Sequence, residues 1–301
     1  MSDARYVIIT PAHNEEGLIG QTIEAVIAQT LRPLCWVIVN DGSTDGTGDI
    51  VQPYVEKYPF IHLLSLRRRA ERNFGKKAIA FRRGAGMIRS LDYGFIGNLD
   101  ADIVVEPDYY MGIIQRFEED PQLGIGGGIV YARVGNRFST SDWSLGSVGG
   151  AVQLFRRACY EAIGGYMPLE YGGIDAAAEI KARMAGWKVR KFPEHKVFEQ
   201  RRTGSAEARP LKARALLGRR FYTLGYAPLF YVARCFYRMT DAPFLVGSMA
   251  ELYGFVECIL RRRPILLSPD VVRYLRGEQR QRLKALPSRL FGSRRLEQEI
   301  R

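Results

Sequence analysis

Short apolar runs rich in β-branched residues alternate with segments of helical periodicity through the first hundred residues. Strands are expected at residues 6–10, 36–39, 61–66 and in the run ending at Asp100, and helices at about 18–28, 49–58 and 78–88. Strands that alternate with helices pair in parallel, and ligands bind at the carboxyl ends of such strands. We therefore predict an α/β fold with a mostly parallel sheet flanked by helices.

Two carboxylates stand one residue apart where the fourth of these strands is expected to end, in the sequence Leu99-Asp100-Ala101-Asp102. In a strand, residues i and i+2 point to the same face, so both side chains can face one hard cation. Mg²⁺ and Mn²⁺ favour such oxygen ligands, often together with substrate phosphates. An Asp-x-Asp pair alone is more often an ordinary polar loop, but Asp41 also falls at a strand end, which favours a ligand site.

The charge of the chain is unevenly distributed. The net charge is +12 over 301 residues, but residues 1–200 hold 23 Lys and Arg against 24 Asp and Glu, whereas residues 201–301 hold 21 against 8. Such asymmetry indicates an anionic partner, either nucleic acid or the cytoplasmic face of a membrane. A hydrophobic content of 47% predicts a folded core.

The four cysteines are far apart in the sequence and show no CxxC spacing: Cys35, Cys159, Cys235 and Cys258. This pattern predicts neither a zinc site nor a disulfide framework, and it suits a reducing cytosol. The first residues lack the charged, apolar and small-residue regions of a signal peptide. We therefore expect a cytoplasmic protein.

The character of the chain changes after residue 210. Residues 211–240 mix aromatic residues with arginines, and residues 242–260 are mostly apolar, interrupted by Glu251 and Glu257. A spanning helix needs ~20 apolar residues, and two glutamates inside it would be costly. A helix or re-entrant pair in the membrane interface, or a helical subdomain packed on the core, fits better. The basic stretch 273–295 favours peripheral or monotopic attachment to an anionic membrane.

Several motifs resemble, in the same order, those of family 2 glycosyltransferases with the Rossmann-like GT-A fold, over about residues 5–205. Thr10-Pro11-Ala12-His13-Asn14-Glu15 resembles the family's opening motif, which borders the nucleotide, and Asn40-Asp41-Gly42-Ser43-Thr44-Asp45 resembles the loop that reads the base. The resemblance implies that Asp41 accepts a hydrogen bond from a base N–H. It implies further nucleotide contacts from Pro11, His13 and Glu15.

The resemblance continues through the two aspartates. Leu99-Asp100-Ala101-Asp102 resembles the family's metal-binding Asp-x-Asp, in which the second Asp contacts Mg²⁺ or Mn²⁺ and the first lies toward the ribose or sugar. Gly75-Lys76-Lys77-Ala78 resembles a Gly-Lys segment, which implies that Lys76, with Arg72 as a further candidate, approaches the phosphates. A solvated basic loop is the alternative for these two residues.

Two further motifs lie near the end of the matching region. Gly172-Gly173-Ile174-Asp175 resembles the Gly-Glu-Asp box, so Asp175 matches the catalytic base, although Ile174 replaces the usual Glu. Asp175 also stands where a helix N-cap is expected. Residues 198–205 resemble a segment that often carries a metal-binding His, and they offer Glu199 or Gln200 instead. Arg201 and Arg202 would neutralise the diphosphate or an anionic acceptor.

Taken together, these residues predict a metal-dependent inverting glycosyltransferase domain over residues 1–205 and a membrane-associating or acceptor-binding extension over 206–301. The donor would be a nucleotide-diphosphate sugar, with UDP or TDP favoured and GDP possible. The acceptor would be a polysaccharide or polyprenyl-diphosphate-linked glycan at the cytoplasmic membrane face. The alternatives are a polyprenyl-phosphate sugar synthase and a non-catalytic nucleotide-binding scaffold. Nucleic-acid binding is not favoured, because the arginines alternate with long apolar runs instead of forming a polar basic groove.

Overall fold

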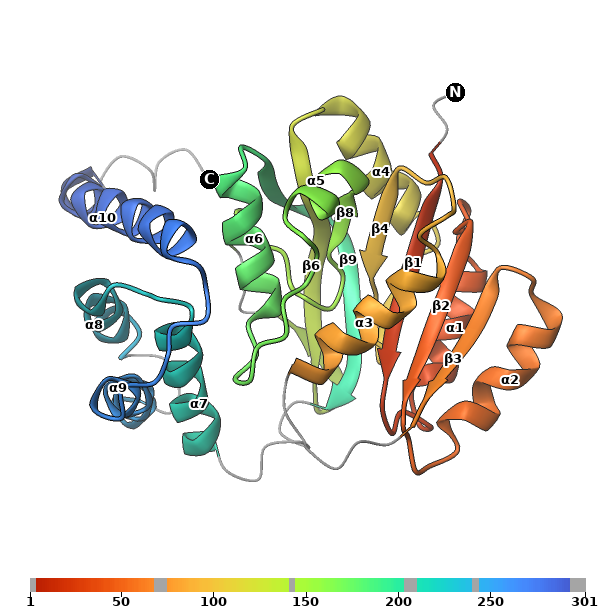
Figure 1. Cartoon of the computed structure of the whole chain (residues 1–301), viewed down its shortest axis with the longest axis horizontal. Coiled ribbons are helices and arrows are strands. Elements are labelled where there is room, and N and C mark those ends of the chain that lie inside the picture. The colour runs from red at the N-terminus through yellow and green to blue at the C-terminus, as the bar shows by residue number, and fades with distance from the viewer. Residues whose placement is uncertain (1–3, 68–74, 141–143, 203–209, 240–243, 293–301) are drawn as a thin grey trace. The chain divides into compact units, whose positions relative to one another are not determined.

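The computed structural model describes residues 4–67, 75–140, 144–202, 210–239 and 244–292, with the backbone alone for Arg202, Pro210 and residues 286–292. The chain divides into two compact units, Met1–Ala208 and Arg209–Arg301, and each is described by itself. Within the first unit, Figure 1 shows a sheet flanked by helices. The expected α/β fold with C-terminal helices is confirmed. The separate roles expected for the two parts stay predictions.

Nine strands in the described part of the first unit form one sheet: β1 Tyr6–Ala12, β2 Cys35–Asp41, β3 Ile61–Leu66, β4 Phe95–Asn98, β5 Ile103–Val105, β6 Leu123–Val134, β7 Arg137–Ser139, β8 Leu154–Arg156 and β9 Lys188–Arg202. Their order is β3-β2-β1-β4-β8-β6-β9-β5, with β7 paired to β6. β3, β2, β1 and β4 run parallel, as do β6 and β9. The carboxyl ends of β1, β2 and β4 therefore share one edge of the sheet, at Ala12, Asp41 and Asn98.

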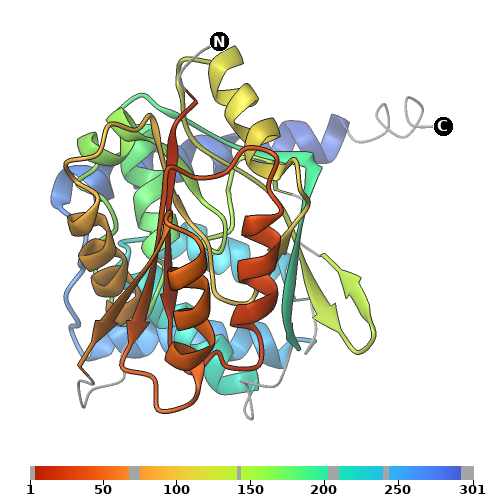
Figure 2. The same cartoon turned by 90° about the vertical axis from the view of Figure 1, so that its right-hand side faces the viewer.

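The helices described in this unit are α1 Ile19–Ile27, α2 Thr47–Lys57, α3 Gly75–Met87, α4 Tyr109–Glu119, α5 Arg157–Ala162 and α6 Ile174–Met184. Alternate residues of β1 face opposite sides of the sheet. Ile8 belongs to the core cluster that includes Ile23 of α1. Ile9 instead approaches α3, where a Cβ added at Gly84 would lie 2.8 Å from the Ile9 Cγ2 atom. α1 and α3 thus cover opposite faces of the sheet (Figure 1, Figure 2).

The sequence did not indicate β5, β7 or β9, and it misplaced the start of α6. The prediction that Asp175 caps this helix is wrong. The helix begins at Ile174, and its N-cap is Gly173, whose φ of 86° lies in the left-handed region that glycine adopts without strain. Asp175 occupies the first turn, where the helix dipole favours a negative charge.

The second unit contains four helices in its described part: α7 Pro210–Thr223, α8 Pro228–Tyr237, α9 Val246–Leu260 and α10 Pro269–Gly292. The backbones of α7 and α9 are in contact at two glycines. A Cβ atom added at Gly218 would lie 1.9 Å from the Glu251 carbonyl oxygen, and one added at Gly254 would lie 1.9 Å from the Ala215 carbonyl oxygen. No helix among the described residues combines the length and hydropathy needed to cross a membrane. Membrane association stays a prediction.

Candidate active site

Hydrogen bonds hold together the two loops that follow β1 and β2. The Asn14 N–H donates to Ser43 Oγ at 3.0 Å, and the Thr44 N–H donates back to Asn14 Oδ1 at 2.9 Å. The Glu16 carboxylate accepts the Gly46 N–H at 2.8 Å. These polar side chains therefore serve local structure, and the neighbouring residues at the strand ends are held in place.

A cavity of about 650 Å³ opens at this edge of the sheet. It is lined by Pro11, Ala12, His13, Glu15, Asp41, Lys76, Lys77, Asp100, Ala101, Asp102, Glu199 and Arg201. The structure thus brings together nine of the site residues expected from the sequence. Asp175 does not line this cavity, and the side chain of Arg202 and the whole of Arg72 lie outside the described residues. The roles expected of all these residues stay predictions.

Asp100 is held by two neighbours. Lys77 Nζ lies 2.6 Å from Asp100 Oδ1, and Asn98 Nδ2 donates to the same oxygen at 2.8 Å. Asn98 Nδ2 also donates to the Gly150 carbonyl at 2.6 Å. Lys76 and not Lys77 was expected at the phosphates, because the sequence does not show where α3 begins and so does not assign either residue to a helix face.

Arg201 joins two carboxylates on the other side of the cavity. Its Nε donates to Asp102 Oδ2 at 3.0 Å, and its Nη2 donates to both carboxylate oxygens of Glu15. Asp102 is 8% exposed, and burial together with the charge of Asp100 raises its pKa. Burial raises the pKa of Glu15 to about 7, against the opposing effect of Arg201.

Glu199 of β9 adds a fifth carboxylate to those of Glu15, Asp41, Asp100 and Asp102, and its pKa is raised by burial and by Asp102. Among the described residues, no three His, Cys, Asp or Glu side chains are gathered closely enough to hold a metal ion on their own. The cavity nevertheless offers carboxylate oxygens, the ligands that Mg²⁺ and Mn²⁺ accept in ones or twos together with substrate phosphates. One or two of the carboxylates of Asp100, Asp102 and Glu199 would therefore suit a divalent cation whose remaining ligands come from a bound diphosphate.

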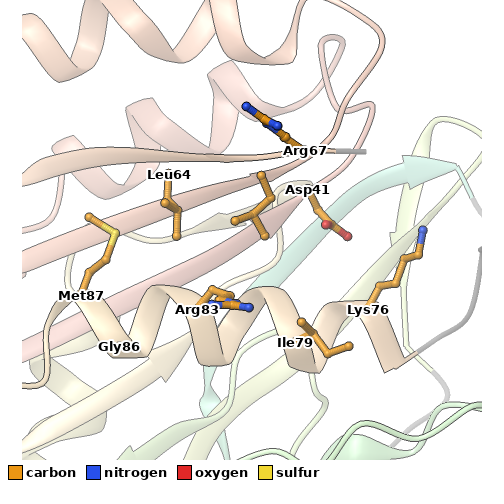
Figure 3. Close-up of a pocket in the computed structure, with 9 residues that line it drawn as sticks. Asp41, Leu64, Arg67, Lys76, Ile79, Arg83, Gly86 and Met87 are labelled. Atoms are coloured by element: carbon orange, nitrogen blue, oxygen red, sulfur yellow. The ribbon is translucent and has the colours of Figure 1, made fainter. Parts of the chain in front are cut away.

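A second cavity, of about 430 Å³, shares Asp41 and Lys76 with the first. Leu64 and Leu66 of β3 form one side of it, and Ile79 of α3 lies on the other. Figure 3 shows the Asp41 carboxylate beside this space between the sheet and α3. The cavity thus has apolar walls, and the charged side chains of Asp41, Arg67, Lys76 and Arg83 also line it. This cavity was not predicted from the sequence, although Leu64 and Leu66 lie at the end of an expected strand.

Asp175 is half-buried and packs against the loop that carries Gly150. A Cβ added at Gly150 would lie 3.0 Å from both the Cβ and the Oδ2 atoms of Asp175. The Gly150 carbonyl also accepts the Asn98 side chain and lies 3.5 Å from Lys77 Nζ. Asp175 therefore adjoins the network around Asp100 without facing the main cavity.

Glu179 lies one helical turn beyond Asp175 and was not singled out from the sequence. It is 4% exposed and accepts the Val148 N–H at 2.7 Å, the Ser147 hydroxyl at 3.2 Å and Gln153 Nε2 at 3.2 Å. Burial raises its pKa to about 7. These bonds fix the loop that packs against Asp175. The sequence shows a Glu within the expected helix. It does not show that this Glu lies on the buried face of the helix.

Solved glycosyltransferases share the fold. The structure of mannosyltransferase PcManGT from Pyrobaculum calidifontis in complex with GDP-Man and Mn²⁺ has 18% identity and a TM-score of 0.54, covering 95% of this chain and 80% of that one. The structure of GalNAc-T7 with UDP, GalNAc and Mn²⁺ has 15% identity and a TM-score of 0.56, covering 85% of this chain and 55% of that one. The expected GT-A-type fold is confirmed.

A family model described as Glycosyl transferase family 2 matches residues 7–166, which is more than half of the chain. The chain belongs to this family, as its motifs predicted. Poly-beta-1,6-N-acetyl-D-glucosamine synthase from Staphylococcus aureus (strain MSSA476) is 27% identical over 202 residues, covering 60% of this chain and 46% of that protein. The chain thus spans less than half the length of this curated relative.

Proposed function

We propose that the chain transfers a sugar from a nucleotide-diphosphate sugar to a glycan acceptor, with inversion at the anomeric carbon. The observation that carries this proposal is the single cavity in which Asp41, Asp100 and Asp102 meet at the carboxyl ends of parallel strands. Family membership supports the reaction class. The name of the Staphylococcus aureus relative supports a polysaccharide as product.

The base of the donor would enter the second cavity beside Asp41. A carboxylate that accepts a base N–H forms a charge-assisted hydrogen bond, and the apolar walls from Leu64, Leu66 and Ile79 suit a flat ring. UDP and TDP sugars are the favoured donors, and GDP sugars are possible. The solved neighbours with GDP-Man or UDP are compatible with either choice.

The diphosphate would lie in the main cavity among Lys76, Lys77 and Arg201. Asp102 and Asp100, with Glu199 as a further oxygen ligand, would hold Mg²⁺ or Mn²⁺. When bound, this cation neutralises the charge that develops on the departing diphosphate. Arg201 pairs with the Glu15 and Asp102 carboxylates, and these pairs hold its guanidinium at the wall of the cavity. Arg202 follows it in the chain and would act on the diphosphate or an anionic acceptor.

Asp175 would act as the general base. The acceptor hydroxyl gives its proton to this carboxylate while its oxygen forms a bond to the anomeric carbon, and the bond from that carbon to the phosphate oxygen breaks. Ile174, which replaces the family's usual Glu, is 7% exposed, so no second carboxylate stands beside the base there. The acceptor would be a polysaccharide or a polyprenyl-diphosphate-linked glycan at the cytoplasmic face of the membrane.

The test is nucleoside diphosphate release by the full chain, from UDP, TDP and GDP sugars with Mn²⁺. A short β-1,6-linked N-acetylglucosamine oligomer or a polyprenyl-diphosphate-linked sugar serves as acceptor. Loss of a general base lowers a rate by about 10²–10⁴ fold, so Asp175→Asn should reduce release by at least about 100-fold. Asp49→Asn, on the exposed side of α2, should leave release unchanged.

Two outcomes would contradict this account. Release that survives in Asp175→Asn would remove the base and favour a lipid phosphate as acceptor, because a phosphate is already a nucleophile. The chain would then be a polyprenyl-phosphate sugar synthase. No release from any donor, despite nucleotide binding, would favour a non-catalytic scaffold.

A further inference from the structure

Helix α9 turns its apolar side chains outward. Residues at alternating spacings of three and four along the helix lie on one face, and all of them are exposed, by 39% to 78%: Val246, Met249, Tyr253, Val256 and Leu260. Phe244 and Leu245, just before the helix, are exposed by 69% and 53%. We call these seven residues the outer face of α9. A helix packed only on its own unit would show polar residues there.

The acidic residues of α9 lie on its inner side. Glu251 is 1% exposed, and its two oxygens pair with Arg214 at 2.7 Å and Arg234 at 2.9 Å. Glu257 pairs with Arg219 at 2.6 Å and with Arg261 at 3.3 Å. Both carboxylates that interrupt the apolar sequence are therefore neutralised by arginines of α7 and α8. The outer face carries no charge among its seven residues.

Basic residues border the outer face at one end. Arg261, Arg262 and Arg263 follow Leu260 directly, and all three are exposed. Residues 201–301 hold 21 Lys and Arg against 8 Asp and Glu. An apolar face beside a cluster of exposed arginines is complementary to lipid tails beneath anionic headgroups. A second copy of the chain would bring the same positive charge to the contact and is less favoured.

The length of α9 limits how it can meet a bilayer. Fifteen residues at 1.5 Å each extend about 22 Å, less than the ~30 Å of a hydrocarbon core. The helix is thus suited to lie along the surface instead of crossing it.

We propose that the outer face of α9 docks on an anionic membrane, with its apolar side chains at the boundary between headgroups and acyl chains and Arg261–Arg263 at the lipid phosphates. This rests on the proposed function for its purpose, which is to bring the site to a lipid-linked acceptor. From the sequence alone, residues 242–260 could form either a helix in the membrane interface or part of a packed helical subdomain. The outer face of α9 is the surface of this segment that would contact the membrane.

Flotation of the full chain with lipid vesicles tests this surface, and no nucleotide sugar is added. The vesicles are phosphatidylcholine alone or phosphatidylcholine with about a third phosphatidylglycerol. The wild-type chain should float with the anionic vesicles and much less with the neutral ones. Met249→Asn combined with Leu260→Asn should weaken this binding by at least about tenfold, because two exposed apolar side chains that would enter the membrane boundary are lost.

The control is Met111→Asn, which changes a methionine of the first unit that is 49% exposed, as against 67% for Met249. It should bind anionic vesicles like the wild type. Absence of vesicle binding, or equal loss in the control and the double variant, would overturn the proposal. A dimer in sedimentation that the double variant dissociates, without vesicle binding, would make a second copy the occupant instead. Since no donor is present, failure here is distinct from failure of sugar transfer.

Discussion

The buried carboxyl of Glu179 should make the first unit less stable as the pH rises. Its pKa is about 7 in the folded chain and 4.5 when ordinarily solvated. Below pH 4.5 the carboxyl is protonated in both states. Between 4.5 and about 7 the unfolded carboxyl ionises while the folded one keeps its proton, so the free energy of unfolding falls. Since each pKa unit is worth 1.36 kcal/mol, the loss approaches about 3 kcal/mol above pH 7.

Glu179→Gln removes this titration and keeps an oxygen that can accept the Val148 N–H. Urea unfolding at about pH 5 and about pH 7.5 measures the effect. The three tryptophans lie in residues 1–208, so their fluorescence reports the first unit. The wild type should lose about 2 kcal/mol more than the variant between these pH values, because part of the loss has already occurred at pH 5. Glu106→Gln, at an exposed carboxyl, should behave like the wild type. Equal pH dependence in the wild type and Glu179→Gln would refute the reasoning.

Two further predictions concern packing and charge. Gly254→Ala should destabilise the second unit by about 1–3 kcal/mol, because the added Cβ would overlap the Ala215 carbonyl of α7. Gly277→Ala, with open space around its Cβ, should not lower the thermal unfolding temperature, and an equal effect at both positions would contradict this packing. Lys77→Met should raise the KM for the nucleotide sugar several-fold in the release assay, because the diphosphate loses a cation, whereas the exposed Arg89→Met should not. An unchanged KM in Lys77→Met would exclude it from the donor site.

The sequence specified the half of the sheet that positions the donor site. β1 and β2 begin as continuous apolar runs, because a strand covered on both faces needs no polar alternation, whereas β3 at the sheet edge exposes His62 and Ser65. The motif residues Asp41 and Asp100 follow such runs, so their meeting could be predicted from the carboxyl-end rule. The cavity confirms that these side chains come together.

Other parts could not be deduced from local pattern. β9 lies between β6 and β5 in the sheet, but its sequence mixes Lys, Arg, Glu and His with Pro193. Two of these polar residues, Glu199 and Arg201, line the cavity. The sequence of β9 therefore lacks the apolar run that marks a strand. The start of α6 depended on the positive φ of Gly173, which made Asp175 a first-turn residue instead of a cap.

The C-terminal helices show the limit of hydropathy along a chain. From the sequence, Glu251 and Glu257 are two charged residues within an apolar segment, where burying a charge costs free energy. Their partners Arg214 and Arg234 lie 37 and 17 residues from Glu251, so the pairing is a tertiary contact that no local window contains. Only the folded unit reveals which face of α9 is apolar.

The central claim is that Asp102 and its neighbours bind a divalent cation together with a nucleoside diphosphate. The most direct measurement is a thermal-shift titration of the full chain with UDP, TDP and GDP, each with and without Mn²⁺, on the wild type, Asp102→Asn and Asp49→Asn. A ligand at about 100 times its Kd stabilises by about 2.7 kcal/mol. The account predicts that one diphosphate stabilises the wild type and Asp49→Asn only with Mn²⁺, and that Asp102→Asn loses the effect. Stabilisation that is equal without Mn²⁺ or in Asp102→Asn would contradict it.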